Sequence, residues 1–355
     1  MADLNALQNW FGKFQPGQSP TGGLQLRPVT GDAGFRAYFR SNTRPPFIAA
    51  LAPPEHEDNP AFVRIAIAMA RGGVHVPKIV AVDYEHGFLL QEDLGETLFL
   101  DVLNSDTQGQ LYDRAEATLL QIQKLPAASA LFPAYDAALL GRELELFPEW
   151  FVGGLLGVKL DAPARRLLDE LFAVLLGSAA GQSQVVVHRD YHSRNLLVLD
   201  DGGVGVIDFQ DAVTGPLTYD LVSLLRDCYI RWPQTLVEQR VEGFRHKLMA
   251  QIAAGEQVVT VPDSETFLRC FDLMGLQRHL KVLGIFARLS LRDGKANYLH
   301  DLPLVMRYVL EVAQKYPETE KFYRWFMDQL EPQFLAQDWY RPWQTAGESV
   351  AAEPV

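Results

Sequence analysis

The sequence predicts an α+β protein with two lobes, a small β-rich N-terminal lobe and a larger, mainly helical C-terminal lobe. Short apolar runs bounded by Gly and Pro dominate the first 95 residues, and longer segments with helical periodicity dominate the rest. One hairpin signal, Asp200-Asp201-Gly202-Gly203, interrupts the helical part. A length of 355 residues allows two lobes with a sizeable core. We therefore expect a lobe over residues 1–95, a lobe over 96–343 that carries the hairpin, and a flexible tail over 344–355.

The composition limits the possible partners. Apolar residues make up 48% and charged residues 21% of the chain, as in ordinary globular proteins. The formal net charge of −12 argues against a nucleic-acid partner, which would require a basic face. Only Cys228 and Cys270 are present, too few for a disulfide framework. The first ten residues lack the features of a signal peptide, and no run approaches the ~20 apolar residues of a membrane span. We expect a cytoplasmic protein without a membrane partner, and a monomer by default.

The elements of the N-terminal lobe follow from short patterns. Helical spacing of apolar residues such as Phe62 and Ile65 predicts a helix that stops at Gly72-Gly73. A shorter amphipathic pattern ends before Pro16-Gly17. The helices are thus expected at 4–14 and 59–71, and the strands at 24–29, 35–40, 46–51, 78–82 and 87–91.

A glycine-containing loop, Gly31-Asp32-Ala33-Gly34, lies between the first two expected strands. Because Gly has no side chain, the backbone of such a loop can approach phosphate oxygens closely. A plain hairpin turn would have the same composition, so both interpretations stay open. In the strand that follows, the alternating pattern places Arg36, Tyr38 and Arg40 on its polar face.

Helical patterns cover most of the chain after residue 95. A β-branched run, Val185–Val187, is the exception that precedes the polar loop and the hairpin. The aromatic residues from Phe322 to Trp343 are expected to dock the last helix, and stacking on a sugar is the alternative. The helices are expected at 108–124, 137–151, 162–178, 216–230, 235–252, 264–291, 302–315 and 318–330.

The hairpin brings polar residues together. With Asp201 and Gly202 as the two turn residues, Asn195 faces Asp208 on the partner strand. Directly opposed residues have Cβ atoms about 4.5–5.5 Å apart. A carboxylate and an amide oxygen so placed can share a hard cation such as Mg²⁺, which substrate phosphates and water usually complete. Asp190, on the loop before Asn195, is then available as a base.

These residues resemble a known pattern. His188-Arg189-Asp190 with Asn195, followed by Asp208-Phe209, fits the catalytic and metal loops of protein kinases, except that Gln210 replaces a glycine. The spacing of Asp190, His192 and Asn195 resembles the small-molecule branch of that fold, the aminoglycoside phosphotransferase and choline kinase group. Asp211, Gly215-Pro216 and Tyr219-Asp220-Leu221 match the continuation of that group's motif.

Within this group the chain looks most similar to the bacterial anomeric sugar kinases that act on N-acetylmuramate and N-acetylglucosamine. The similar segments are Gly31–Arg36, Ala52–Glu55 and Leu276–Phe286, and the resemblance covers nearly the whole chain. It implies a protein-kinase-like fold, ATP and Mg²⁺ as cofactors, and an amino sugar as acceptor. It also implies formation of a sugar 1-phosphate for peptidoglycan recycling.

The resemblance also implies roles for single residues. Asp190 would accept the proton of the sugar hydroxyl, and Asn195 and Asp208 would hold Mg²⁺. His188 and Asp220 would support the catalytic loop, with a direct role of His188 as the alternative. His192 would either touch the metal site or brace it. The residues implied for ATP binding are Gly31, Asp32, Ala33, Gly34 and Arg36 at the phosphates and Gln91, Glu92 and Asp93 at the adenine, where these three could also be a simple connector.

One departure from the kinase pattern concerns a missing ion pair. Kinases place a lysine on the third strand of the small lobe and pair it with a helix glutamate. The matching run 46–51 contains no lysine, and 61–71 contains no glutamate. Arg36, Arg40, Arg64 and Lys78 are the candidate replacements, and the metal alone is the alternative.

The sequence says less about which residues would contact the sugar acceptor. Four cationic residues, Arg278, Lys281, Arg288 and Arg292, share one face if the helix extends that far. That face is either solvated or a site for the carboxylate of muramate. We expect substrate contacts at His192, Asp211, Arg278 and His279. Another small-molecule kinase, acting on an aminoglycoside, choline or homoserine, and a nucleotide-binding pseudokinase scaffold remain as alternatives.

Overall fold

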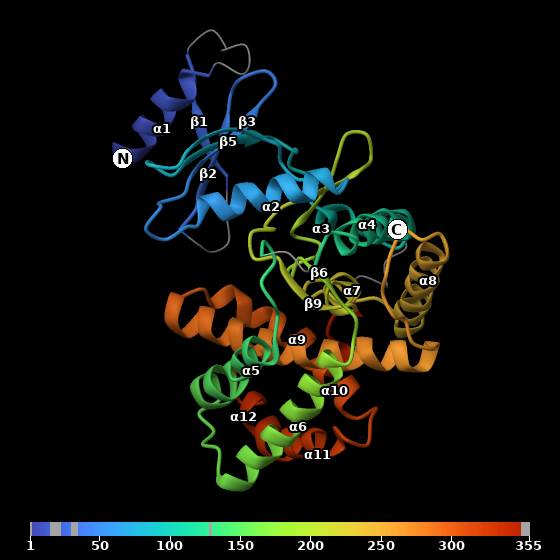
Figure 1. The fold of residues 1–355 in the computed structure, drawn as a ribbon. Helices are drawn as coiled ribbons and strands as arrows, with labels where there is room; N and C mark the ends of the chain where they lie inside the picture. The colour runs from blue at the N-terminus through green and yellow to red at the C-terminus, as the bar shows by residue number, and fades with distance from the viewer. Residues whose placement is uncertain (1, 15–22, 30–34, 128–129, 349–355) are drawn as a thin grey trace. The chain divides into compact units, whose positions relative to one another are not determined.

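The computed structural model describes residues 2–14, 23–29, 35–127 and 130–348 (Figure 1). The chain divides into two compact units, one of residues 1–101 with 194–212 and one of residues 102–193 with 213–355. The hairpin therefore belongs to the first unit, whereas the sequence predicted it within the helical lobe. The predicted α+β class is confirmed, since the first unit contains an antiparallel sheet and the second is mainly helical.

The centre of the first unit is a five-stranded antiparallel sheet in the order β1-β2-β3-β5-β4. All seven elements predicted before residue 95 are present, with bounds within two residues of those expected. On one side of the sheet, Leu7, Trp10 and Phe11 of the first helix pack against residues such as Phe88 and Leu90. The elements are α1 (Ala2–Gly12), β1 (Leu26–Val29), β2 (Ala37–Ser41), β3 (Phe47–Leu51), α2 (Asn59–Arg71), β4 (Ile79–Asp83) and β5 (Phe88–Glu92).

Helix α2 has the bounds that its sequence predicts. The Asp58 carboxylate accepts a hydrogen bond from the Ala61 amide at 2.9 Å, which caps the helix. Pro60 fits the first turn because its missing N–H has no partner there in any helix. Phe62 and Met69 lie on the buried face. Local signals therefore suffice to define this helix.

The hairpin consists of β7 (Leu196–Val198) and β8 (Val204–Val206), and its predicted register is wrong by one residue. Leu196 pairs with Val206, so Asn195 lies opposite Ile207 and not Asp208. The turn contains three residues, because the Leu199 amide donates to the Gly203 carbonyl at 3.0 Å. Gly202 adopts a φ of 77°, and the Asp201 carboxylate accepts a hydrogen bond from the Gly203 amide. A turn that ends in a left-handed glycine thus replaces the expected two-residue turn.

In the second unit, strands β6 (Gln184–Val187) and β9 (Val213–Pro216) form an antiparallel pair. The sequence predicted a helix from Pro216, and the structure has β9 and a shorter helix instead. The expected helix over 137–151 is likewise divided into an α-helix and a π-helix. The helices after residue 95 are α3 (Phe99–Val102), α4 (Gln108–Gln123), α5 (Ala137–Leu144), η1 (Phe147–Leu155), α6 (Ala162–Ala180), α7 (Tyr219–Leu225), α8 (Gln234–Ala253), α9 (Ser264–Asp293), η2 (Ala296–Asp301), α10 (Leu302–Ala313), α11 (Glu320–Trp325), η3 (Phe326–Leu330), α12 (Glu331–Phe334) and η4 (Trp343–Thr345).

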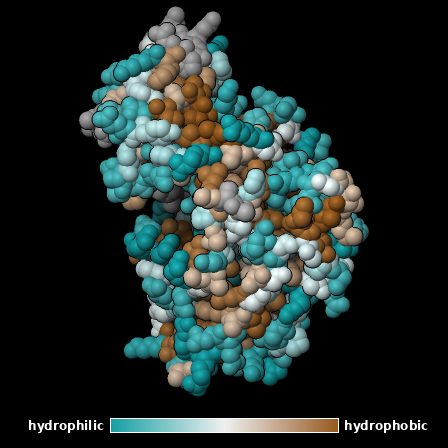
Figure 2. Space-filling view, viewed as in Figure 1, coloured by the Kyte–Doolittle hydropathy of each residue, from teal (hydrophilic) through white to brown (hydrophobic). Residues whose placement is uncertain are grey.

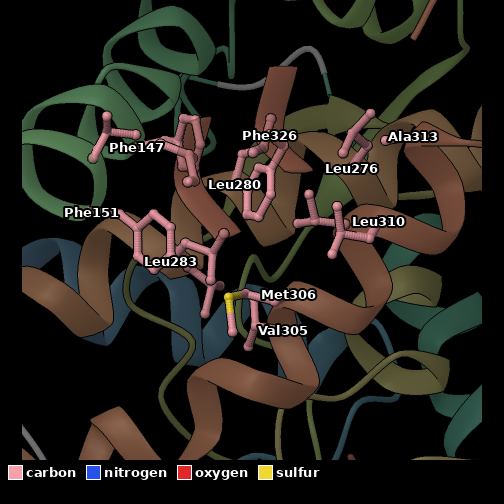
Figure 3. Packing of buried hydrophobic residues seen from close by; sticks show 14 of the residues in the cluster. Phe147, Phe151, Leu276, Leu280, Leu283, Val305, Met306, Leu310, Ala313 and Phe326 are labelled. Carbon is pink, nitrogen blue, oxygen red and sulfur yellow. The ribbon is translucent and has the colours of Figure 1, made fainter. Parts of the chain in front are cut away.

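Helix α9 forms the centre of the core of the second unit. The Asp263 side chain caps its N-terminus, and Gly294 ends it with a φ of 68°. Figure 3 shows Leu280 and Leu283 of α9 among Phe147, Phe151 and Phe326. The C-terminal aromatic residues join the same cluster, which confirms that they dock the last helices.

Hydrophilic residues cover much of the face seen in Figure 2, and hydrophobic residues are exposed between them in small patches. Of the helices that the structure describes, none has the length and apolar character needed to cross a membrane.

Candidate active site

The expected catalytic loop, residues 188–193, follows β6 in the second unit, and its backbone is held by Asp220 of α7. The two carboxylate oxygens of Asp220 accept hydrogen bonds from the amides of His188 at 2.6 Å and Arg189 at 3.0 Å. Burial raises the pKa of Asp220 to about 6. The His188 ring is fully buried and its Nδ1 accepts a hydrogen bond from the Asp190 amide at 3.3 Å. These contacts fix the backbone on both sides of Arg189, whose φ of 77° is rare for a residue with a side chain.

Asp190 lies beside a buried cation. The Arg278 guanidinium, from α9, donates to the carbonyl of Arg189 at 3.0 Å and lies 3.6 Å from a carboxylate oxygen of Asp190. The Asp190 side chain keeps 42% of its surface exposed, so a ligand can reach it. Desolvation would raise the pKa of this carboxyl, but the charges of Arg278 and Lys281 outweigh it and hold the pKa below the usual range. Asp190 is therefore ionised at neutral pH.

A buried ion network lies behind the loop. Glu143 of α5 accepts a hydrogen bond from Arg189 at 2.5 Å and forms an ion pair with Lys281 at 2.9 Å. The Lys281 ammonium also lies 3.3 Å from the hydroxyl of Tyr219. Desolvation would raise the pKa of Glu143, but the two cations lower it. The network keeps two positive charges near Asp190 without leaving a buried charge unpaired.

The two residues of α9 that were expected to contact substrate lie inside the unit. Arg278 is only 3% exposed, and its guanidinium is used by the catalytic loop. His279 has no exposed surface, its Nε2 lies 3.0 Å from the Arg226 carbonyl, and burial lowers its pKa to about 3. Neither side chain is placed to meet a sugar from solvent. The cationic face is divided as well, because Lys281 is buried and Arg292 is exposed.

His192 and Asp211 occupy different units. His192 is half-buried beside Tyr229, and burial lowers the pKa of its ring. Its Nδ1 has no hydrogen-bond partner among the residues that the structure describes. Asp211 is exposed in the first unit. Glu143 was not predicted as a supporting residue, and neither was the buried Asp227, which accepts a hydrogen bond from the Ser193 amide at 2.8 Å. Arg226-Asp227-Cys228 lies beyond the motif that ends at Leu221, so no sequence signal pointed to it.

The structure brings Asn195 and Asp208 together although the predicted register is wrong. The Asn195 amide nitrogen lies 3.4 Å from Asp208 Oδ2, and Gln210 donates to Asp208 Oδ1 at 2.7 Å. Asp208 has a φ of 63°, which turns it out of the strand path at the end of the hairpin. The side chains thus meet because of this backbone turn and not because of direct cross-strand pairing.

This pair has the donors that a substrate-bound Mg²⁺ requires. A rotation of the Asn195 amide about its terminal bond would present an oxygen to the same space as Asp208. No group of three or more His, Cys, Asp or Glu side chains suited to a metal occurs in the described parts of the chain. Mg²⁺ commonly binds through one or two carboxylates together with substrate phosphates. The residues therefore fit a metal that arrives with a nucleotide.

The residues expected at the nucleotide lie in the first unit. Gly31, Asp32, Ala33 and Gly34 fall outside the described residues. Gln91 is buried in β5, and the Glu92 amide donates to the Lys78 carbonyl at 2.9 Å. The Asp93 carboxylate is bound by Arg40.

The architecture, one unit with an antiparallel sheet and one mainly helical unit, is the kinase-like fold. A choline kinase from Streptococcus pneumoniae superposes with a TM-score of 0.59 at 12% identity, over 88% of this chain and 100% of that one. An ADP-bound aminoglycoside phosphotransferase gives 0.55 at 12% identity, over 86% and 98% of the two chains. These likenesses show the fold.

Comparison at the level of sequence is more specific. The model of a family described as "Phosphotransferase enzyme family" matches residues 25–255. The chain is 43% identical to the N-acetylmuramate/N-acetylglucosamine kinase of Pseudomonas aeruginosa, over 83% of this chain and 85% of that protein. It is 44% identical to the protein of the same name from Pseudomonas putida, over 85% and 87%. The chain belongs to the phosphotransferase enzyme family.

Proposed function

We propose that this protein is an ATP-dependent sugar kinase that phosphorylates the anomeric hydroxyl of N-acetylmuramate, N-acetylglucosamine or both. The observation that carries the proposal is the similarity to the two Pseudomonas kinases, which spans more than four fifths of the chain. The product would be a sugar 1-phosphate for use in peptidoglycan recycling in the cytoplasm.

In the proposed reaction, Asp190 accepts the proton of the anomeric hydroxyl. The hydroxyl oxygen forms a bond to the γ-phosphorus of ATP while the bond from that phosphorus to the bridging oxygen of ADP breaks. A carboxylate that is ionised at neutral pH and partly exposed is suited to this proton transfer.

Asn195 and Asp208 are proposed to hold Mg²⁺. When bound, this ion would neutralise the charge that develops on the phosphate oxygens. Kinase families use ATP and usually a divalent metal, which agrees with the donor set at these two residues. His192, on the same loop as Asp190, is only half-buried and is proposed to contact the sugar.

A panel of acceptors tests the proposal. The full-length protein is incubated with ATP and Mg²⁺, and ADP release is measured with N-acetylmuramate, N-acetylglucosamine, their 1-O-methyl glycosides, kanamycin and choline. We expect turnover of at least one free amino sugar and none of its methyl glycoside, because the glycoside lacks the anomeric hydroxyl. Turnover of kanamycin or choline without turnover of amino sugars would refute the assignment. ATP binding without turnover of any acceptor would instead favour a scaffold.

A further inference from the structure

The first unit has no lysine where kinases pair one with the nucleotide phosphates. The third strand, β3 (Phe47–Leu51), pairs with β2 and β5 in the sheet and consists of apolar residues. Helix α2, which follows it, contains no glutamate. In kinases a lysine at this position of the third strand contacts the α- and β-phosphates, and a glutamate on the following helix holds it in place. Another cation of this unit would have to supply that charge.

The four candidate cations, Arg36, Arg40, Arg64 and Lys78, differ in their contacts and their exposure. The Arg40 guanidinium is bound to the Asp93 carboxylate at 2.5 and 2.9 Å and to the Gly95 carbonyl at 2.9 Å. Arg64 on α2 and Lys78 before β4 are exposed to solvent. Arg36, immediately before β2, differs from all three.

The Arg36 side chain is buried, and only some of its hydrogen-bond donors have partners among the described residues. Its side chain is 6% exposed, and its Nη2 lies 2.9 Å from a carboxylate oxygen of Glu57. The guanidinium lies over the ring of Phe62 at 4.3 Å from the ring centre. Its Nε has no hydrogen-bond partner among the residues that the structure describes. A buried guanidinium N–H without an acceptor lowers the stability of the fold. An anion or another acceptor that binds this N–H removes that cost.

The ring beneath the Arg36 guanidinium also contacts the loop that carries Asp208, which belongs to the same unit. Phe62 stacks on Phe209, the residue after Asp208, with ring centres 4.9 Å apart and planes inclined at 24°. Burial raises the pKa of the Tyr38 hydroxyl, the charge of Arg36 lowers it and the charge of Asp208 raises it. The Phe62 ring thus contacts both the Arg36 guanidinium and Phe209, the neighbour of Asp208 in sequence.

We propose that Arg36 and Glu57 replace the missing lysine–glutamate pair, with the Arg36 guanidinium binding the α- and β-phosphate oxygens of the nucleotide and Glu57 holding it in position. This inference rests on the proposed kinase function, since it names the group that receives the phosphates at the same site. A planar guanidinium can bind a carboxylate with one edge and phosphate oxygens with another, which an ammonium group cannot do in the same fixed geometry.

Binding of ADP and adenosine to the full-length protein tests the inference, with calorimetry as the measurement. Arg36→Gln is expected to weaken ADP binding about tenfold or more, since a hydrogen bond to a charged group is lost. Adenosine binding should change less than about twofold, because adenosine has no phosphate. Arg64→Gln is the matched control: it removes the same charge from an exposed position of α2 and should leave both affinities unchanged.

A second variant covers the case in which Arg36→Gln does not fold. Glu57→Gln keeps the shape of the partner and removes the charge that holds Arg36, so it should weaken ADP binding by a smaller factor without changing adenosine binding. The inference is overturned if folded Arg36→Gln binds ADP with an affinity within twofold of wild type. It is also overturned if Arg36→Gln loses affinity equally for ADP and adenosine, or if Glu57→Gln leaves the ADP affinity unchanged.

These binding measurements need no sugar. Failure of the proposed function, in which wild type binds ADP and phosphorylates no acceptor, therefore differs from failure of the inference, in which Arg36→Gln binds ADP normally.

Discussion

At the scale of single residues, the environment of Asp190 is dominated by two cations from one helix. Arg278 and Lys281 lie three positions apart on α9, so they share a side of the helix. Arg278 holds the peptide of Arg189 in its left-handed conformation and lies near the Asp190 carboxylate. One side chain thus positions the proposed base, Asp190, and favours its ionised form. We classify Arg278 as a positioning residue, because it contacts the loop and not the expected acceptor.

Replacing Asp190 tests its role as base. Asp190→Asn should reduce phosphoryl transfer about 10²–10⁴-fold, the usual contribution of general-base catalysis. ATP affinity should stay near wild type, since Asp190 is not among the residues assigned to the nucleotide. Steady-state rates with the preferred amino sugar and calorimetry with ATP measure the two quantities. A variant that keeps more than about a tenth of the wild-type rate would contradict the assignment.

Replacing Arg278 should shift the pH dependence of the reaction. In wild type the lowered pKa keeps Asp190 ionised, so its protonation should reduce kcat/KM only below the ordinary range of aspartate, about pH 4. Arg278→Gln removes the main lowering charge, the pKa of Asp190 rises, and the acidic fall of kcat/KM should move to higher pH. Arg292→Gln removes an exposed charge from the end of the same helix and serves as the control. Overlapping profiles for Arg278→Gln and wild type would argue against this electrostatic role.

At the scale of elements, the close approach of α9 to the π-helix η1 organises the core of the second unit. Gly284 of α9 lies against the backbone of Leu146, the residue before η1. A Cβ at position 284 would meet the Leu146 carbonyl and lie 2.6 Å from its Cβ. Any side chain at this position would therefore push two backbones apart.

Gly284→Ala is expected to lower the free energy of unfolding by about 1–3 kcal/mol, the usual cost of overpacking. The gain of about 1 kcal/mol that Ala normally brings to a helix should not compensate for it. Gly243→Ala in α8 is the matched control, since no atom lies within 4 Å of its added Cβ and it should be neutral or stabilising. Urea denaturation measures both. Equal stability of Gly284→Ala and wild type would show that the two helices separate without cost.

Element by element, the sequence predicts what local signals define. Helix α2 has the expected bounds because Asp58, Pro60 and Gly72-Gly73 mark its ends within the chain itself. The hairpin was recognised, but its turn was not, because a left-handed Gly202 followed by Gly203 also permits a three-residue turn. Strand β9 was missed because its partner β6 lies far back in the chain, and pairing between distant segments leaves no periodic signal in so short a strand.

In the candidate site, too, local motifs were predictable from the sequence and tertiary packing was not. The motif spacing selected Asp190, Asn195 and Asp208 as candidates, and the structure joins the last two through the positive φ of Asp208, which the sequence did not predict. Burial depends on tertiary packing, so the sequence could not tell that Arg278 and His279 face the interior while Arg292 faces solvent.

At the scale of the whole molecule, the chain passes between its two units three times, after residues 101, 193 and 212. Residues 194–212 are integrated into the first unit by backbone contacts. The Val206 amide donates to the His75 carbonyl at 2.8 Å, and the Val198 amide donates to the Thr97 carbonyl at 2.9 Å. The hairpin is therefore tied to elements far from it in sequence, which explains why sequence proximity assigned it to the other lobe.

This division predicts which amides should open together. Leu90 has no exposed surface in the core of the first unit, and truncation of a buried leucine costs about 2–5 kcal/mol. Leu90→Ala should therefore accelerate native-state hydrogen exchange of the Val198 and Val206 amides together with those of β3 and β5. Leu280→Ala makes the same change in the core of the second unit, where Leu280 is also fully buried. It should accelerate exchange in β6 and β9 and leave Val198 and Val206 near their wild-type rates. If Leu280→Ala accelerated exchange at Val198 and Val206 as much as Leu90→Ala does, the hairpin would open with the second unit, and its assignment to the first would be wrong.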